Sequence, residues 1–148
     1  MIPASFEEFE PGQTFAFGSY TLTEADIVDF ATEYDPQPFH VDAAAAEDTM
    51  FGGLIASGWQ TCSVTMRLLV DNFMNKTASL GAAGVDELRW LRPVRPGDTL
   101  SVRIEVLETS PAETDPTRGD VYYEISTYNQ DDEKVLSMKA LGMIGRES

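Results

Sequence analysis

The sequence predicts an α+β fold in which an antiparallel sheet wraps around one long helix. Two observations support this prediction. Residues 57–75 form a helical segment whose apolar residues cover nearly every side, so this helix should be buried on most faces. The second half of the chain contains four consecutive strand-like segments joined by short connections, which is typical of an antiparallel sheet. A helix that is apolar on most sides needs a concave sheet to bury it.

The first elements follow from aromatic residues, a cap and a proline. Residues 13–21 hold aromatic residues between two glycines and are predicted to form a strand or hairpin arm. Thr23 is typical of a helix N-cap, and Asp26 lies where a capping-box acid would sit. One face of this helix is predicted to hold Ile27, Phe30, Ala31 and Tyr34. Pro36 ends the helix, because proline pushes its predecessor out of the helical region.

Two more helices are predicted before the sheet. Asp42 is expected to cap a short helix over residues 43–47, which are good helix formers. The long helix runs from Ser57 to about residue 75. On it, Arg67 and Asp71 are spaced i, i+4 and should form an ion pair.

The second half is predicted to be a series of strands. Apolar alternation is clearest in residues 100–106, and the other predicted strands cover residues 85–94, 121–127 and 135–144. Turns are expected at residues 96–98 and 129–132, and a polar loop at residues 111–119. The break in alternation at Leu91 suggests a bulge or a twist in the first of these strands.

Length and charge limit the classes of function. With 148 residues and 43% hydrophobic content, the chain is expected to form one domain over residues 1–148. Ten Lys and Arg against 25 Asp and Glu give a net charge of −15, which argues against nucleic-acid and anionic-membrane partners. Cys62 is the only cysteine, so no intrachain disulfide is possible, and a buried small hydrophobe is its favoured role. With no signal-like start and no membrane-spanning run, a cytoplasmic location is expected.

The stretch from Tyr34 to Asp42 carries the candidate chemistry. It contains the only histidine of the chain, His40, five residues after Asp35, with two prolines between them. Because prolines restrict the backbone, we expect a rigid loop with Asp35 and Gln37 extended. Such a loop can hold a carboxylate and an imidazole toward one small volume, as acid–base catalysis requires. A lone histidine is more often structural, but the fixed carboxylate partner favours a catalytic role.

These residues resemble the MaoC-like, (R)-specific enoyl-CoA hydratase family, whose members have the hot-dog fold. The family signature reads roughly Asp-x-Asn-Pro-[Ile/Leu]-His-x-[Asp/Glu], and here it stands as residues 35–42, Asp-Pro-Gln-Pro-Phe-His-Val-Asp. A glycine at the start of the central helix follows in the family, as Gly58 does here. The Pro-Val-x-x-Gly-Asp turn of hot-dog proteins matches residues 93–98. The resemblance extends over about residues 6–144.

The resemblance implies a role for each matching position. Asp35 would deprotonate a water molecule, and His40 would hold the same water and help to deliver a proton to the α carbon. The backbone N–H of Gly58 would bind the thioester oxygen as negative charge develops there. By position, Gln37, Pro38 and Ser57 would contribute to substrate binding. The substrate implied is a coenzyme A thioester, with no metal and no other cofactor.

Several residues depart from the family pattern. Gln37 replaces asparagine, Tyr34 stands where glycine is frequent, and Ser57 stands where many members have histidine. The acid, the proline and the imidazole keep their spacing, so hydration of trans-2-enoyl-CoA to (R)-3-hydroxyacyl-CoA stays the leading hypothesis. Three arginines are candidates for contacts with the coenzyme A phosphates, although solvated strand-edge charges explain them better: Arg89, Arg92 and Arg95.

Two other functions stay open. A hot-dog thioesterase usually carries a carboxylate on or beside the central helix, where Asp71 is the only candidate. An acyl-thioester-binding module without catalysis is the third hypothesis. For each of the three, we expect at least a homodimer, because the long helix has more apolar surface than one small sheet can cover.

Overall fold

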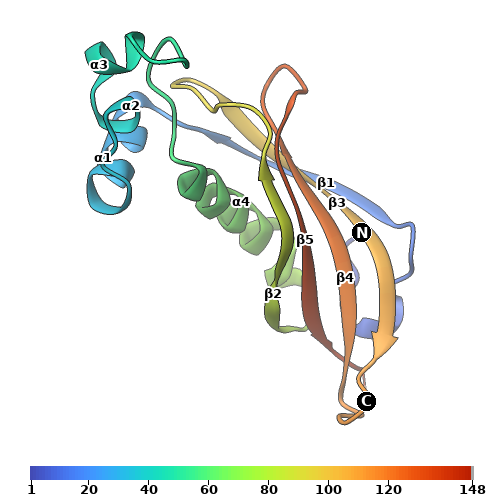
Figure 1. Cartoon of the computed structure of the whole chain (residues 1–148). Coiled ribbons are helices and arrows are strands. Elements are labelled where there is room, and N and C mark those ends of the chain that lie inside the picture. The colour runs from blue at the N-terminus through green and yellow to red at the C-terminus, as the bar shows by residue number, and fades with distance from the viewer. Residues whose placement is uncertain (148) are drawn as a thin grey trace.

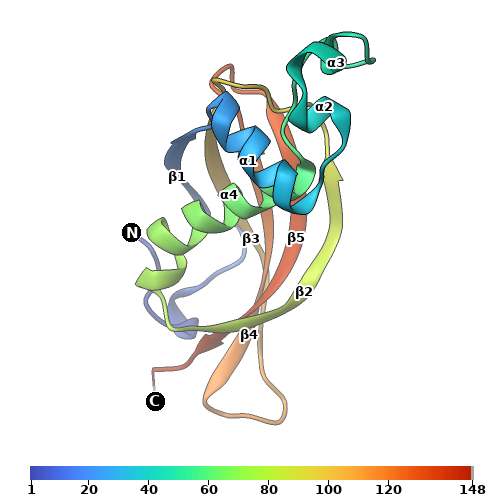
Figure 2. The same ribbon diagram turned by 90° about the vertical axis from the view of Figure 1, so that its left-hand side faces the viewer.

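The architecture is a five-stranded antiparallel sheet that curves around one long helix (Figures 1 and 2). The computed structural model describes residues 1–147. The strands are β1 (Thr14–Thr21), β2 (Ser79–Trp90), β3 (Thr99–Pro111), β4 (Arg118–Tyr128) and β5 (Lys134–Gly145). The helices are α1 (Glu24–Tyr34), α2 (Pro38–Val41), α3 (Ala43–Glu47) and α4 (Gly58–Asn72). Two single 3-10 turns complete the list, at Phe6–Glu8 and Met74–Lys76.

The strand order is β1-β3-β4-β5-β2, with every neighbouring pair antiparallel. The chain order is therefore not the sheet order, because β2 pairs with β5 at the far edge. This arrangement leaves β1 and β2 as the two edge strands. The helix α4 lies across the concave face, and α1, α2 and α3 gather near its N-terminal end (Figure 1).

The core lies between the sheet and the inner face of α4. Its largest aromatic cluster centres on Phe73, which is fully buried at the C-terminal end of α4. The ring centroids of four other aromatic residues lie 5.5 to 6.1 Å from that of Phe73, and these residues are Phe9, Phe15, Phe17 and Tyr123. This cluster anchors the end of α4 that lies away from α1, α2 and α3.

Local signals in the first half predict the structure well. Thr23 caps α1, and its side chain forms the predicted capping box with Asp26. The Asp42 carboxylate caps α3 by accepting hydrogen bonds from the N–H groups of Ala44 and Ala45. The predicted ion pair between Arg67 and Asp71 is present on the exposed face of α4, with an N–O distance of 2.7 Å.

Three sequence-based expectations are wrong in detail. The segment after Pro36 is not a loop throughout, because Pro38–Val41 forms a turn of helix with proline at its first position. Asp35 has φ −154° and ψ 66°, whereas Gln37 is extended as predicted. In the single chain α4 also has one exposed face, since the sheet covers only the opposite side, and Trp59 is 57% exposed there.

The strand β2 differs most from its prediction. It begins at Ser79, six residues before the predicted start. The prediction began too late because the small residues 81–84 carry almost no apolar alternation. Its register with β5 shifts at three places, and the last of these bulges lies between Asp86 and Arg89 rather than at Leu91. Glu87 inside this bulge has a positive φ of 52°. A left-handed residue of this kind bends the strand and re-aims the side chains that follow it.

None of the helices within residues 1–147 is both long and apolar enough to cross a bilayer.

Candidate active site

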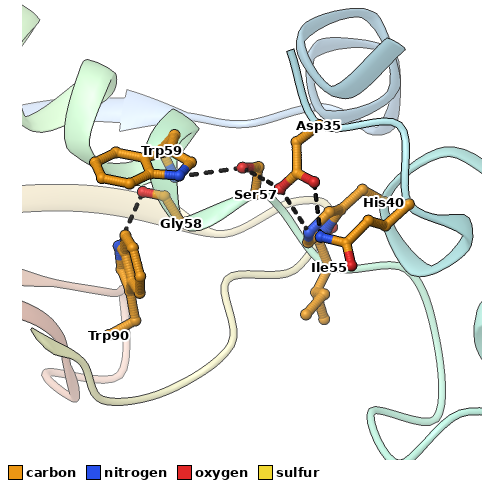
Figure 3. Close-up of polar contacts among 8 residues, drawn as sticks. Asp35, His40, Ile55, Ser57, Gly58, Trp59 and Trp90 are labelled. Atoms are coloured by element: carbon orange, nitrogen blue, oxygen red, sulfur yellow. Dashed lines mark hydrogen bonds and ion pairs between the residues drawn. The ribbon is translucent and has the colours of Figure 1, made fainter.

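The site forms where α1 ends and α4 begins. Asp35 is the C-cap of α1, and its N–H donates to the carbonyl of Ala31 at 2.8 Å. Pro36 prevents another helical turn, so the chain leaves α1 and enters α2 two residues later. His40 lies on α2, and Ser57 and Gly58 start α4. The prolines and caps of the sequence thus bring three separate segments to one place (Figure 3).

His40 is buried, and both of its ring nitrogens have partners. Its Nδ1 atom lies 2.7 Å from the carbonyl oxygen of Ile55, and its Nε2 atom lies 3.2 Å from Oδ2 of Asp35. A carbonyl oxygen can only accept a hydrogen bond, so Nδ1 carries a hydrogen. A neutral imidazole would then point its Nε2 lone pair at the Asp35 carboxylate. Nε2 is therefore the ring nitrogen that faces the Asp35 carboxylate.

The Asp35 carboxylate receives two more hydrogen bonds. The side-chain amide of Gln37 donates to Oδ1 at 2.7 Å, and the hydroxyl of Ser57 donates to Oδ2 at 2.8 Å. Burial raises the pKa of Asp35, but the two hydrogen bonds and the charge of His40 outweigh it, so its pKa lies below the usual value. The anionic form of the Asp35 carboxylate is therefore stabilised next to the Nε2 atom of His40.

Ser57 joins the acid–base pair to the long helix. Its side chain is fully buried, and its oxygen also accepts a hydrogen bond from the N–H of Trp59 at 3.3 Å, as the N-cap of α4. One hydroxyl therefore orients the Asp35 carboxylate and satisfies a free N–H of the helix. This link fixes the pair relative to the first turn of α4.

Gly58 is the first residue of α4. Within residues 1–147 its N–H has no hydrogen-bond acceptor, as expected for a first-turn N–H at the positive end of a helix dipole. A side chain cannot be placed there, because a Cβ atom on Gly58 would lie 2.4 Å from the indole of Trp90. Glycine at this position is thus a packing requirement.

A pocket of about 440 Å³ connects these groups. Asp35, Gln37, His40 and Gly58 all lie on its wall. The apolar part of the wall includes Phe39, Phe51, Ile55, Trp59, Trp90 and Val94. A carboxylate beside an imidazole, a glycine whose N–H has no acceptor within residues 1–147 and an apolar surface therefore line one cavity, which suits a substrate with a carbonyl group and a hydrocarbon part.

Two residues expected in the binding wall lie elsewhere. Pro38 is exposed at the start of α2, and Ser57 lies behind the wall with its hydroxyl toward Asp35. Neither belongs to the pocket lining among the described residues. Proline at a first helical position serves the backbone, and the N-cap of a helix turns its side chain toward its own N–H groups, which accounts for both.

The three arginines have different surroundings. Arg92 lines the pocket and pairs with Glu133 at 3.0 Å. Arg95 donates to the carbonyl of Phe51 at 2.6 Å, and Arg89 donates to the carbonyl of Leu88 at 3.0 Å. Only Arg92 therefore faces the space that a substrate would enter.

Other candidate residues lie outside this chemistry. Asp71 pairs with Arg67, lies near the far end of α4 and is absent from the pocket wall within residues 1–147. Burial raises the pKa of the Cys62 thiol, which disfavours a nucleophilic thiolate. No group of three or more His, Cys, Asp or Glu in the described part of the chain is arranged to hold a metal ion.

Sequence reasoning did not identify two of the contacts in this site. The carbonyl of Ile55 and the indole of Trp90 contribute to the site, yet neither belongs to a motif. A backbone carbonyl leaves no signal in the residue type. The apolar residues of 88–91 indicated a strand, but nothing in them indicated which helix that strand would contact.

Comparison with known proteins gives a consistent result. The family model described as MaoC like domain matches residues 6–129. An uncharacterised Bacillus subtilis protein, YdeM, is 33% identical over 140 residues, which cover 95% of this chain and 98% of that protein. The crystal structure of a MaoC-like dehydratase from Rhodospirillum rubrum has a TM-score of 0.90 and 39% identity, covering 97% of this chain and 98% of that one.

Two further structures add to this comparison. An unliganded R-hydratase from Pseudomonas aeruginosa has a TM-score of 0.78 and 29% identity, covering 97% of this chain and 86% of that one. A Mycobacterium tuberculosis protein described as a double hot-dog fold has a TM-score of 0.78 at 20% identity, covering 98% of this chain and 45% of that one. This second likeness concerns the fold alone. The expected hot-dog fold is confirmed.

Proposed function

The chain belongs to the MaoC-like hydratase and dehydratase family, and from this premise we propose that it catalyses the reversible hydration of trans-2-enoyl-CoA to (R)-3-hydroxyacyl-CoA. The observation that carries the proposal is the 3.2 Å approach of Asp35 Oδ2 to His40 Nε2 on the wall of a pocket that Gly58 also lines. Hydration needs a group that removes a proton from water and a group that gives a proton to carbon. The pair supplies both.

The proposed reaction starts from an ionised Asp35 and a His40 that carries a proton on each ring nitrogen. The water oxygen bonds to C3 of the enoyl thioester, and one water proton passes to Asp35. His40 gives its Nε2 proton to C2, so that one proton enters the pair and one leaves it. Asp35 then holds the proton that His40 lacks, and transfer across the Oδ2–Nε2 contact of 3.2 Å restores the starting state. The Nδ1–H stays with the carbonyl of Ile55 throughout.

The thioester oxygen becomes negative as C3 is attacked. We propose that the Gly58 N–H binds this oxygen, since it has no acceptor in residues 1–147 and lies at the N-terminus of a helix of 15 residues. A fixed donor at such a position contributes roughly 3–4 kcal/mol to the transition state. Gln37 would keep the Asp35 carboxylate oriented, and the apolar wall would hold the acyl chain.

The quaternary structure is also a proposal. The edge strand β2 is exposed along almost its whole length, and Leu80 and Val85 on it are 58% and 52% exposed. Trp59 and Met66 on the uncovered face of α4 are exposed to a similar degree. Pairing of two β2 strands from two copies would satisfy the edge and cover both helices. We therefore propose a homodimer formed along β2.

A thioesterase is disfavoured by the position of Asp71. A carboxylate acting on the thioester would have to reach the pocket, whereas Asp71 is exposed and already paired with Arg67. No observation favours this function over hydration.

The direct test is an absorbance assay. Purified protein mixed with crotonyl-CoA should cause loss of the enoyl absorbance, and chiral analysis should show the (R)-3-hydroxy product. Absence of turnover with short, medium and branched enoyl-CoA substrates would overturn the proposal. Release of free thiol from saturated acyl-CoA would favour the thioesterase instead.

A further inference from the structure

We infer that Trp90 is a positioning residue for the Gly58 N–H, and this inference rests on the proposed function of that N–H. Trp90 is the last residue of β2, far from the acid–base pair in sequence. Its side chain nevertheless lies against the first residue of α4, and both residues line the pocket (Figure 3).

The contact between the two residues is close and has two parts. A Cβ atom built on Gly58 would lie 2.4, 2.6 and 2.7 Å from three atoms of the indole, so the ring fills the space of the missing side chain. The indole Nε1–H also donates a hydrogen bond to the Gly58 carbonyl at 3.0 Å. Trp90 therefore restrains both the Cα atom and the carbonyl of Gly58.

The neighbouring peptide groups complete the restraint. The peptide between Gly58 and Trp59 is held at its carbonyl by Trp90 and at its N–H by the Ser57 hydroxyl. The peptide between Ser57 and Gly58 is held at its carbonyl, which accepts hydrogen bonds from the N–H groups of Gln60 and Thr61. Of the polar groups in these two peptides, the Gly58 N–H alone lacks a partner within residues 1–147. The hydrogen bonds to these two peptide groups therefore fix the direction of the Gly58 N–H.

Glycine makes such a restraint necessary. A residue without Cβ has more accessible φ and ψ values than any other, so a glycine N–H at a helix start is poorly oriented by its own backbone. An oxyanion donor contributes most when it is already oriented before charge develops. The indole supplies the steric limit that a side chain on Gly58 would otherwise supply.

The conformation of β2 places the Trp90 indole next to Gly58. The register with β5 shifts between Asp86 and Arg89, and Glu87 adopts its positive φ inside this bulge. An ion pair of 2.7 Å between Glu87 and Lys139 of β5 ties the bulge to the sheet. After the bulge Trp90 pairs with Leu136, and its ring packs edge-to-face on Trp59 with centroids 5.1 Å apart. The bulge thus sets the register at which Trp90 reaches Gly58.

Substitutions at Trp90 should lower kcat, and the effect of a substitution at Gly58 should depend on the residue at position 90. Trp90→Phe keeps a ring but removes the donor, and we expect kcat to fall about 10-fold, the cost of one such hydrogen bond. Trp90→Ala removes ring and donor, and we expect kcat to fall about 100-fold, as a misplaced group typically costs.

Gly58→Ala alone keeps the N–H but drives a methyl group into the indole. Combined with Trp90→Ala, the same methyl group has room, so the double variant should exceed Gly58→Ala in kcat and in Tm.

The experiment measures kcat and KM with crotonyl-CoA, and Tm, for wild type, both single variants at Trp90, Gly58→Ala and the double variant. Thr21→Val is the control, because it removes one exposed hydrogen bond between β1 and β3, outside the pocket wall. The expected result is a loss in kcat rather than in KM for Trp90→Phe, no change for the control, and recovery in the double variant.

The outcomes distinguish failure of the role inferred for Trp90 from failure of the proposed hydratase function. Wild-type turnover with an unchanged kcat in Trp90→Ala would overturn the inference alone, and so would a double variant no better than Gly58→Ala. Failure of the wild type to turn over any enoyl-CoA would overturn the proposed function and the inference together. If Trp90→Ala does not fold, Trp90→Phe carries the kinetic test with the same criteria.

Discussion

The Nε2 atom of His40 lies 3.2 Å from the Oδ2 atom of Asp35, and the Nδ1 atom of the same ring lies 2.7 Å from the carbonyl oxygen of Ile55. The carbonyl of Ile55 orients the ring, because it accepts the hydrogen on Nδ1 and leaves Nε2 facing the carboxylate. In the proposed hydration, this orientation would let Nε2 deliver a proton to carbon.

Asp35→Asn should abolish most turnover while leaving substrate binding intact. The amide cannot take a proton from water, so we expect kcat to fall by about 10²–10⁴-fold. Calorimetric titration with the saturated analogue butyryl-CoA should give a Kd close to that of wild type. If the wild type also shows binding but no turnover, the chain is an acyl-thioester-binding module.

Ser57→Ala should shift the acidic limb of the pH profile to higher pH. The Ser57 hydroxyl is one of the groups that lower the pKa of Asp35, so its removal raises that pKa. In the proposed reaction Asp35 acts as the base when it is deprotonated, so a higher pKa means that activity is lost at a higher pH on acidification. The measurement is kcat/KM against pH.

Ser63→Ala is the matched control for this experiment. The Ser63 hydroxyl also lies on α4 but donates to the carbonyl of Trp59 and does not contact Asp35. Its acidic limb should coincide with that of wild type. An unshifted limb in Ser57→Ala would contradict the role assigned to the Ser57 hydrogen bond.

Phe73→Ala should destabilise the fold strongly without touching the acid–base pair. Phe73 is fully buried and contacts four aromatic rings. Replacing a buried phenylalanine by alanine costs about 3–5 kcal/mol, part of which arises from the cavity left behind. Urea unfolding measures this cost. Met50→Ala, at a side chain that is 92% exposed, should change the free energy of unfolding by less than about 0.5 kcal/mol.

Val85→Lys should convert the proposed dimer to a monomer. Val85 lies on the edge strand β2, and a lysine there places a charge where a second β2 strand would pair. Light scattering should give twice the chain mass for wild type and the single chain mass for the variant. Thr14→Lys on the opposite edge strand β1 is the control and should keep the wild-type mass. A wild-type protein of single chain mass would refute the dimer.

Short-range features of this protein could be read from its residues. The capping box of Thr23 and Asp26, the cap at Asp42 and the pair of Arg67 and Asp71 each join residues at most four positions apart. Such contacts depend on local backbone geometry, which residue type largely controls. Asp35 and His40 are five positions apart, and Pro36 limits the paths between them, so their approach was also foreseeable.

Only the folded chain decided the remaining contacts. Ser57 reaches Asp35 across 22 positions, and Trp90 reaches the Gly58 carbonyl across 32. The pairing of β2 with β5 at the sheet edge brings Trp90 to α4. The residue pattern of β2 does not indicate that β5 is the strand it pairs with. Contacts of this kind arise when packing of the whole core selects one register among several that local preference allows. The sequence therefore specified the acid and the imidazole, whereas tertiary packing specified how they and the Gly58 N–H are held.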